Sequence, residues 1–79
     1  DQADYTSASL TTEGLFAFQY GKVEMRARVP GGRGTWPAFW TLGTNVHREG
    51  WPRCGEIDVL EHVGHDPHRV HFTVHTERY

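Results

Sequence analysis

The sequence predicts an all-β protein built from short antiparallel strands that pack as a sandwich or a barrel. Two segments alternate regularly between apolar and polar residues, which is typical of half-buried strands. Turn-forming residues recur at a spacing of roughly 8–12 residues, and the 79-residue chain contains 9 glycines and 4 prolines. No segment has the apolar periodicity of a helix, so we expect strands joined by turns.

The strand candidates follow one another along the chain. Residues 22–29 (KVEMRARV) alternate apolar and charged side chains over the whole segment. In residues 69–77 (RVHFTVHTE), Val70, Phe72 and Val74 face one way and the polar residues between them face the other. Weaker candidates are residues 6–12 (TSASLTT), 16–20 (FAFQY) and 37–42 (PAFWTL). Glycine- and proline-rich turns separate these segments, as expected for neighbouring antiparallel strands.

A last strand candidate, residues 56–63 (EIDVLEHV), combines β-branched residues with the carboxylates Glu56, Asp58 and Glu61. In a regular strand Glu61 would point away from the other two acids, because side chains alternate between faces. Burying an unpaired carboxylate costs several kcal/mol. A β-bulge around Val59–Leu60 removes the conflict, since one extra residue turns Glu61 onto the face of Glu56 and Asp58.

The bulge also brings the two glutamates within reach of a shared substrate. Four strand steps separate Glu56 from Glu61, roughly 13 Å between Cα atoms at ~3.3 Å per step. The side chains then leave on the order of 5–7 Å between the carboxyl groups. A retaining glycosidase needs ~5–5.5 Å and an inverting one ~6.5–9.5 Å, so the spacing leans toward retention.

The motif GEIDVLEHVG (residues 55–64) resembles the signature of glycoside hydrolase family 16, in the E-x-D-x-x-E form of its laminarinase-like branch. Residues 20–43 (YGKVEMRARVPGGRGTWPAFWTLG) resemble the region before the catalytic strand, and residues 70–76 (VHFTVHT) resemble the strand after it. The resemblance implies a β-jelly-roll sandwich of the concanavalin A-like type. Residues 1–79 are then expected to be about a third of one catalytic domain.

The resemblance also implies the roles of the acids. Glu56 is expected to be the nucleophile, Glu61 the general acid/base, and Asp58 the group that holds the nucleophile by a shared proton or hydrogen bond. Hydrolysis would proceed by double displacement. That division of labour requires Glu61 to be protonated while Glu56 is ionised.

Further side chains are candidates for substrate binding. Indole faces stack on pyranose rings, and the family associates tryptophans at the positions of Trp36, Trp40 and Trp51 with its cleft. The alternative is that at least one of them is core, because large aromatics dominate sandwich interiors. Arg26 matches a recurrent family arginine, with a solvated strand face as the alternative. His75 falls where the family often has a histidine near the acid/base.

The remaining histidines do not predict a metal site. His62, His65 and His68 follow the acids through a turn at spacings of three, so they share no helical face. A divalent ion at Glu56 and Glu61 would also block their chemistry. We therefore expect no cofactor within this segment, although the family often carries a structural calcium whose ligands would lie outside it.

Composition excludes other classes of function. The net charge of −2 argues against a nucleic-acid or anionic-membrane partner. The single cysteine excludes an internal disulfide. No apolar run reaches the ~20 residues of a membrane span. The expected partner is a polysaccharide, bound by a monomer outside the cell or in the periplasm, because that is where the polymer lies.

Three functions remain open at this point. The first is a retaining endo-glycosidase for β-1,3-glucan of the laminarin type. The second is a relative that cleaves β-galactans, of the agarase, porphyranase or galactanase type. The third is a non-catalytic glycan-binding homologue, against which the intact Glu56 and Glu61 count.

Overall fold

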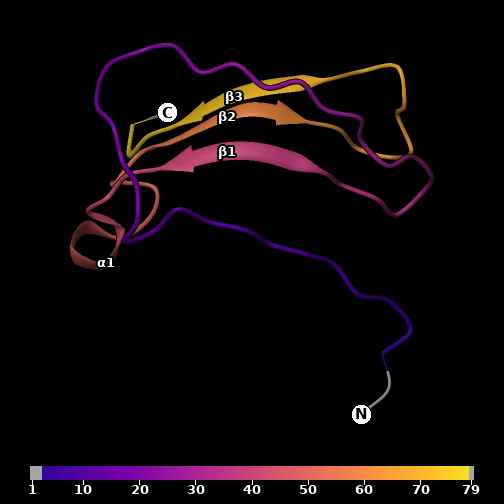
Figure 1. The fold of residues 1–79 in the computed structure, drawn as a ribbon, viewed down its shortest axis with the longest axis horizontal. Coiled ribbons are helices and arrows are strands. Elements are labelled where there is room, and N and C mark those ends of the chain that lie inside the picture. Colours follow the sequence, from indigo (N-terminus) through magenta and orange to yellow (C-terminus); the bar gives the residue numbers. More distant parts are fainter. Residues whose placement is uncertain (1–2, 79) are drawn as a thin grey trace.

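The computed structural model describes residues 3–78 and contains one antiparallel sheet with the strand order β1-β2-β3 (Figure 1). The strands are β1 (Ala38–Leu42), β2 (Glu56–Glu61) and β3 (His71–His75). A helical turn, α1 (Val46–Glu49), lies in the connection between β1 and β2. Apart from this turn the described regular structure is all-β, as the sequence predicts.

Local sequence explains where the strands begin and end. Gly55 precedes β2 with a φ of 86°, in the left-handed region that favours glycine. A turn over residues 64–68, which contains Gly64 and Pro67, reverses the chain between β2 and β3. The sequence predicted no helix, and α1 is an exception of only 4 residues. It is too short to produce a periodic pattern.

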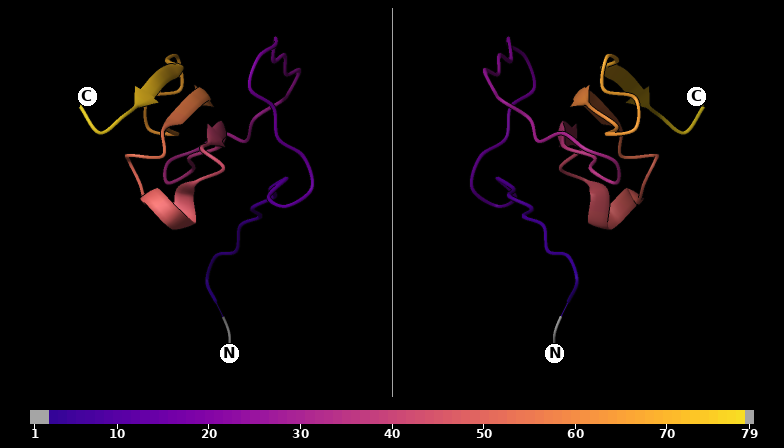
Figure 2. Two further views of the ribbon diagram at one scale, coloured as in Figure 1. Left: turned by 90° about the vertical axis from the view of Figure 1, so that its left-hand side faces the viewer. Right: turned by 90° about the vertical axis from the view of Figure 1, so that its right-hand side faces the viewer.

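Three strand predictions are wrong for the described residues. Segments 6–12, 16–20 and 22–29 form no strand, and Figure 2 shows this part of the chain as an irregular path beside the sheet. The apolar side chains of 22–29 remain partly open to solvent, with Val23 36% and Met25 40% exposed. Alternation selects a face, but a strand also needs a neighbouring strand for its backbone hydrogen bonds. None of the described residues supplies one to these segments.

In residues 3–78 the buried side chains are polar. No hydrophobic residue in this range is buried, whereas Asp58 is 3% and His62 is 7% exposed. One face of the sheet carries Ile57, Phe72 and Val74, all of which are exposed. None of the helices in the described range is long and apolar enough to cross a membrane.

Candidate active site

The register of the sheet places the three acids of β2 on one face. Residues directly opposite each other on neighbouring strands share a face. Three cross-strand rows result, and each contains one acid: Leu42–Glu56–His75, Trp40–Asp58–Thr73 and Ala38–Glu61–His71. We call these nine residues the acidic face. The central strand therefore presents its carboxylates between the side chains of two neighbours.

The acids share this face because the register shifts once along β2. Asp58 pairs with Trp40 while Leu60 pairs with Phe39, so β2 carries one more residue than β1 in this stretch. The pairing with β3 has the same excess between Asp58 and Glu61. The sequence predicts a β-bulge at Val59–Leu60, and a one-residue shift is the pattern that such a bulge produces.

Asp58 is the most enclosed of the three acids. It is 3% exposed, and its Oδ2 lies 2.9 Å from Nε2 of His75. Burial raises the pKa of Asp58 above its usual value, and the neighbouring carboxyl group of Glu56 raises it further. The hydrogen bonds with His75 and Glu61 act in the opposite direction. A carboxyl group in this position is suited to hold a proton between itself and Glu56.

Glu56 is held by two aromatic rings. The indole Nε1–H of Trp51 donates to Oε1 of Glu56 over 2.8 Å, and Oε2 of Glu56 lies 3.8 Å from Nε2 of His75. The rings of Trp51 and His75 contact each other with centroids 5.5 Å apart. The Glu56 carboxylate therefore has a fixed donor on one oxygen and a histidine beside the other.

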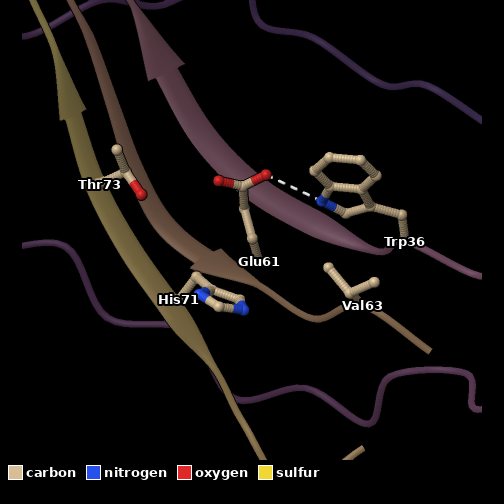
Figure 3. Close-up of a pocket in the computed structure, with 5 residues that line it drawn as sticks. All are labelled: Trp36, Glu61, Val63, His71 and Thr73. Atoms are coloured by element: carbon tan, nitrogen blue, oxygen red, sulfur yellow. Dashed lines mark hydrogen bonds between the residues drawn. The ribbon is translucent and has the colours of Figure 1, made fainter. Parts of the chain in front are cut away.

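Glu61 opens into a hollow. The pocket has a volume of about 310 Å³ and is lined by Trp36, Glu61, Val63, His71 and Thr73 (Figure 3). Nε1–H of Trp36 donates to Oε2 of Glu61 over 2.8 Å. Figure 3 shows the carboxylate between Trp36 on one side and Thr73 on the other.

Backbone contacts explain how Trp36 reaches Glu61. His62 N–H donates to the Pro37 carbonyl over 3.0 Å, and Gly64 N–H donates to the Thr35 carbonyl over 2.8 Å. These bonds continue the pairing of β1 with β2 beyond the strand ends. A Cβ at Gly64 would collide with the Gly32 carbonyl, so only glycine permits this close approach.

Two other predicted site residues, Trp40 and Arg26, differ in whether they lie on the same face as the acids. Trp40 belongs to the acidic face and is 44% exposed, opposite Asp58 in the register. Arg26 lies in the irregular segment, and within residues 3–78 it forms no ion pair with Glu56, Asp58 or Glu61. The structure thus does not bring Arg26 to the acids through a direct contact.

Some contacts of the site differ from the sequence-based expectation. His75 was expected near the acid/base Glu61, but it contacts Asp58 and Glu56 instead. Trp36 and Trp51 were expected to stack on sugars, whereas here each also donates a hydrogen bond to a glutamate. The available signal was chemical: an indole N–H can only donate, so it usually finds an acceptor.

One group of side chains has the composition of a metal site. Ligand atoms of Glu56, Asp58 and His75 all lie within 4.8 Å of one another. Two carboxylates and an imidazole are donors that divalent ions accept. The same atoms are already joined by the His75–Asp58 hydrogen bond. The prediction that the site uses no metal stays a prediction.

Comparisons with known proteins relate the chain to carbohydrate-active domains. The family model described as "XgeA-like, catalytic GH16 domain" matches residues 5–79. A β-glucanase of Rhodothermus marinus is 53% identical over 78 residues, covering 96% of this chain and 27% of the relative. A β-1,3-glucan-binding protein of Penaeus monodon is 51% identical over 61 residues, covering 77% of this chain and 17% of the relative.

A solved structure agrees with these similarities. The X-ray structure of an endo-β-1,3-glucanase from Pyrococcus furiosus matches with a TM-score of 0.64 at 54% sequence identity. The match covers 66% of this chain and 20% of that chain. The present chain spans about a quarter of the length of the Rhodothermus relative.

Proposed function

The chain belongs to the XgeA-like catalytic domains of glycoside hydrolase family 16, and we propose that it carries the catalytic strand of a retaining endo-glycosidase acting on β-1,3-glucan of the laminarin type. The observation that carries the proposal is that the three carboxylates of β2 lie on one face of the sheet, the acidic face. The printed names of the Rhodothermus and Pyrococcus relatives support β-glucan as the substrate class.

The proposed reaction is a double displacement. An oxygen of Glu56 attacks the anomeric carbon, while Glu61 gives its proton to the glycosidic oxygen. The C1–O bond breaks, and its electron pair stays with the leaving sugar. Water then attacks C1 and gives a proton to Glu61, and Glu56 leaves with the electron pair of the ester bond.

The surroundings of the acids support these roles. Trp51 holds one oxygen of Glu56, so the carboxylate cannot turn freely, and orientation of a reacting group is a large part of catalysis. The raised pKa of Asp58 suits a carboxyl group that shares a proton with the nucleophile. The pocket beside Glu61 provides room for part of the sugar chain.

We propose that the remaining contacts to the sugar come from the exposed indoles. Trp40 stands on the acidic face, and the exposed parts of Trp36 and Trp51 border it. The proposed role of Arg26 in substrate binding rests on the sequence alone. The proposed protein acts as a monomer outside the cell or in the periplasm, without a cofactor in this segment and without a nucleic-acid or membrane partner.

A second function is a glycan-binding protein without turnover. The name of the Penaeus monodon relative favours it. The full set of Glu56, Asp58 and Glu61, each with a ring nitrogen within hydrogen-bond distance, favours the enzyme instead. A binding surface has no need of paired carboxylates at this spacing.

The test uses the full-length protein that contains these residues. Release of reducing ends is measured on laminarin, mixed-linkage β-glucan and agarose, with Glu56→Gln as the matched control. We expect turnover on laminarin with the β-anomer as the first product by proton NMR. Turnover on agarose alone would select the galactan-cleaving function. Binding without turnover on any polymer would select the glycan-binding function.

A further inference from the structure

Both glutamates of the acidic face are bonded to a group that can donate but not accept. Trp36 donates to Oε2 of Glu61 and Trp51 donates to Oε1 of Glu56, each over 2.8 Å. An indole carries a single N–H and no acceptor, so the direction of both hydrogen bonds is fixed. One oxygen of each carboxylate therefore accepts an indole N–H, and the other oxygen does not.

For Glu61 the hydrogen bond from Trp36 determines which carboxyl oxygen carries the proton. The oxygen that accepts from Trp36 must offer a lone pair, and the carbonyl oxygen of a carboxylic acid is a better acceptor than its hydroxyl oxygen. A proton on Glu61 is therefore favoured on Oε1. Among the described residues, no N–H group donates to Oε1.

The oxygen of Glu61 that does not accept from Trp36 points away from the indole. In Figure 3 the second oxygen of Glu61 faces away from the indole, toward the side where Thr73 lies. Thr73 is the cross-strand partner of Asp58, and Asp58 lies between the two glutamates along β2. Oε1 thus lies on the side of Thr73, whose partner Asp58 stands between the two glutamates along β2, and a glycosidic bond must lie between these glutamates to be cleaved.

We propose that Trp36 is a positioning residue that selects Oε1 of Glu61 as the oxygen which delivers the proton to the leaving group and takes it back from water. This inference rests on the proposed function. The proton moves from Oε1 to the glycosidic oxygen as the C1–O bond breaks, and a proton of the attacking water returns to Oε1 in the second step. Trp36 exchanges no proton at any point.

Trp51 provides a matched comparison at the other glutamate. It occupies Oε1 of Glu56 and contacts the ring of His75. Its removal would loosen the nucleophile, which every substrate needs. The removal of the Trp36 N–H would affect only substrates whose leaving group needs a proton. The two variants therefore differ in how the loss depends on the leaving group.

The experiment measures kcat/KM of the full-length protein for Trp36→Phe and Trp51→Phe on two substrates. One substrate is laminarin, and the other is a dinitrophenyl β-1,3-oligoglucoside, whose phenolate leaves without protonation. For Trp36→Phe we expect a loss of about 10- to 100-fold on laminarin, part of the ~10²–10⁴ that general acid catalysis supplies. On the activated substrate we expect a loss at least about fivefold smaller than on laminarin, because both substrates lose the indole contact with the sugar but only laminarin also needs the proton.

For Trp51→Phe we expect similar losses on both substrates. Because Trp36 is 66% exposed, Trp36→Phe is expected to fold, and circular dichroism melting checks this. Equal losses of Trp36→Phe on both substrates, or no loss on either, would overturn the inference while leaving the enzyme function standing. If the wild type hydrolyses neither substrate, the proposed function fails and this inference fails with it.

Discussion

The two ends of β2 surround their glutamates differently. Glu56 is enclosed, with 18% of its side chain exposed and with Trp51 and His75 beside it. Glu61 borders an open pocket of about 310 Å³, at the lower end of the ~300–1,000 Å³ range of ligand sites. A nucleophile needs a fixed position, whereas an acid/base needs room for the departing sugar. The difference between the two ends matches the two proposed roles.

The largest expected effect is on the rate of hydrolysis when either glutamate is replaced by glutamine. Glu56→Gln should lower the hydrolysis of every substrate by about 10³-fold or more, as removal of a nucleophile does in other hydrolases. Glu61→Gln should lower laminarin hydrolysis by about 10²–10⁴-fold. On an activated aryl glycoside it should retain the first step, because no proton is needed there.

Added azide provides the control for this comparison. Azide attacks the glycosyl-enzyme without losing a proton, so it should restore turnover of the activated substrate in Glu61→Gln and not in Glu56→Gln. Formation of a glycosyl azide is followed by chromatography and mass spectrometry. If azide instead restored turnover of Glu56→Gln with retained configuration, Glu56 would not be the nucleophile and the assigned roles would be wrong.

A smaller effect concerns stability at the enclosed end. His75→Ala removes the nitrogen partner of Asp58, which is 3% exposed. Leaving a buried acceptor without its partner costs about 1–3 kcal/mol, so the free energy of unfolding should fall by about that amount. Urea denaturation of the full-length protein measures it.

His71→Ala is the matched change at the open end. His71 is exposed, and no hydrogen bond of its side chain is present among residues 3–78. Its removal should change the free energy of unfolding by less than about 0.5 kcal/mol, as surface substitutions usually do. Equal losses for the two histidine variants would show that the two ends do not differ in packing.

The pH dependence of stability should report the burial of Asp58. Its pKa is raised above the ordinary value of 3.8, chiefly by burial. The folded state then binds the proton more tightly than the unfolded chain does. The contribution of Asp58 to stability is complete below 3.8 and is lost as the pH rises through the folded pKa.

Asp58→Asn removes this titration while keeping an oxygen that can accept a hydrogen bond. The melting temperature of the variant relative to the wild type should therefore increase as the pH rises from below 3.8 and then become constant. A difference that decreases over the same interval would mean that the environment of Asp58 favours its charged form.

The smallest expected effect is that of a chelator. Glu56, Asp58 and His75 could together bind an ion, but the proposed reaction uses them as nucleophile and supporting groups. Dialysis against EDTA should leave laminarin hydrolysis unchanged at a temperature well below unfolding. A loss restored by one divalent ion would show that the enclosed end is a metal centre.

The sequence predicted the acidic face better than it predicted the strands. The irregular spacing of Glu56, Asp58 and Glu61 was enough to infer that they share a face, because alternation leaves few other solutions. Segment 22–29 alternates more regularly than any other and still forms no strand, since regular alternation does not provide a pairing partner. The hydrogen bonds of Trp36 and Trp51 depend on how loops return to β2, which periodicity does not describe.

The position of β2 in the middle of the sheet affects how often the strand that carries the three acids opens. Both of its edges are hydrogen-bonded to neighbours, while β1 and β3 each leave one edge without a partner strand among residues 3–78. Opening of an outer strand exposes that strand's amides to exchange with solvent and leaves the central strand bonded on its other side. Among residues 3–78, amide deuteration should therefore be slowest at β2, so the spacing of the glutamates is kept when β1 or β3 opens.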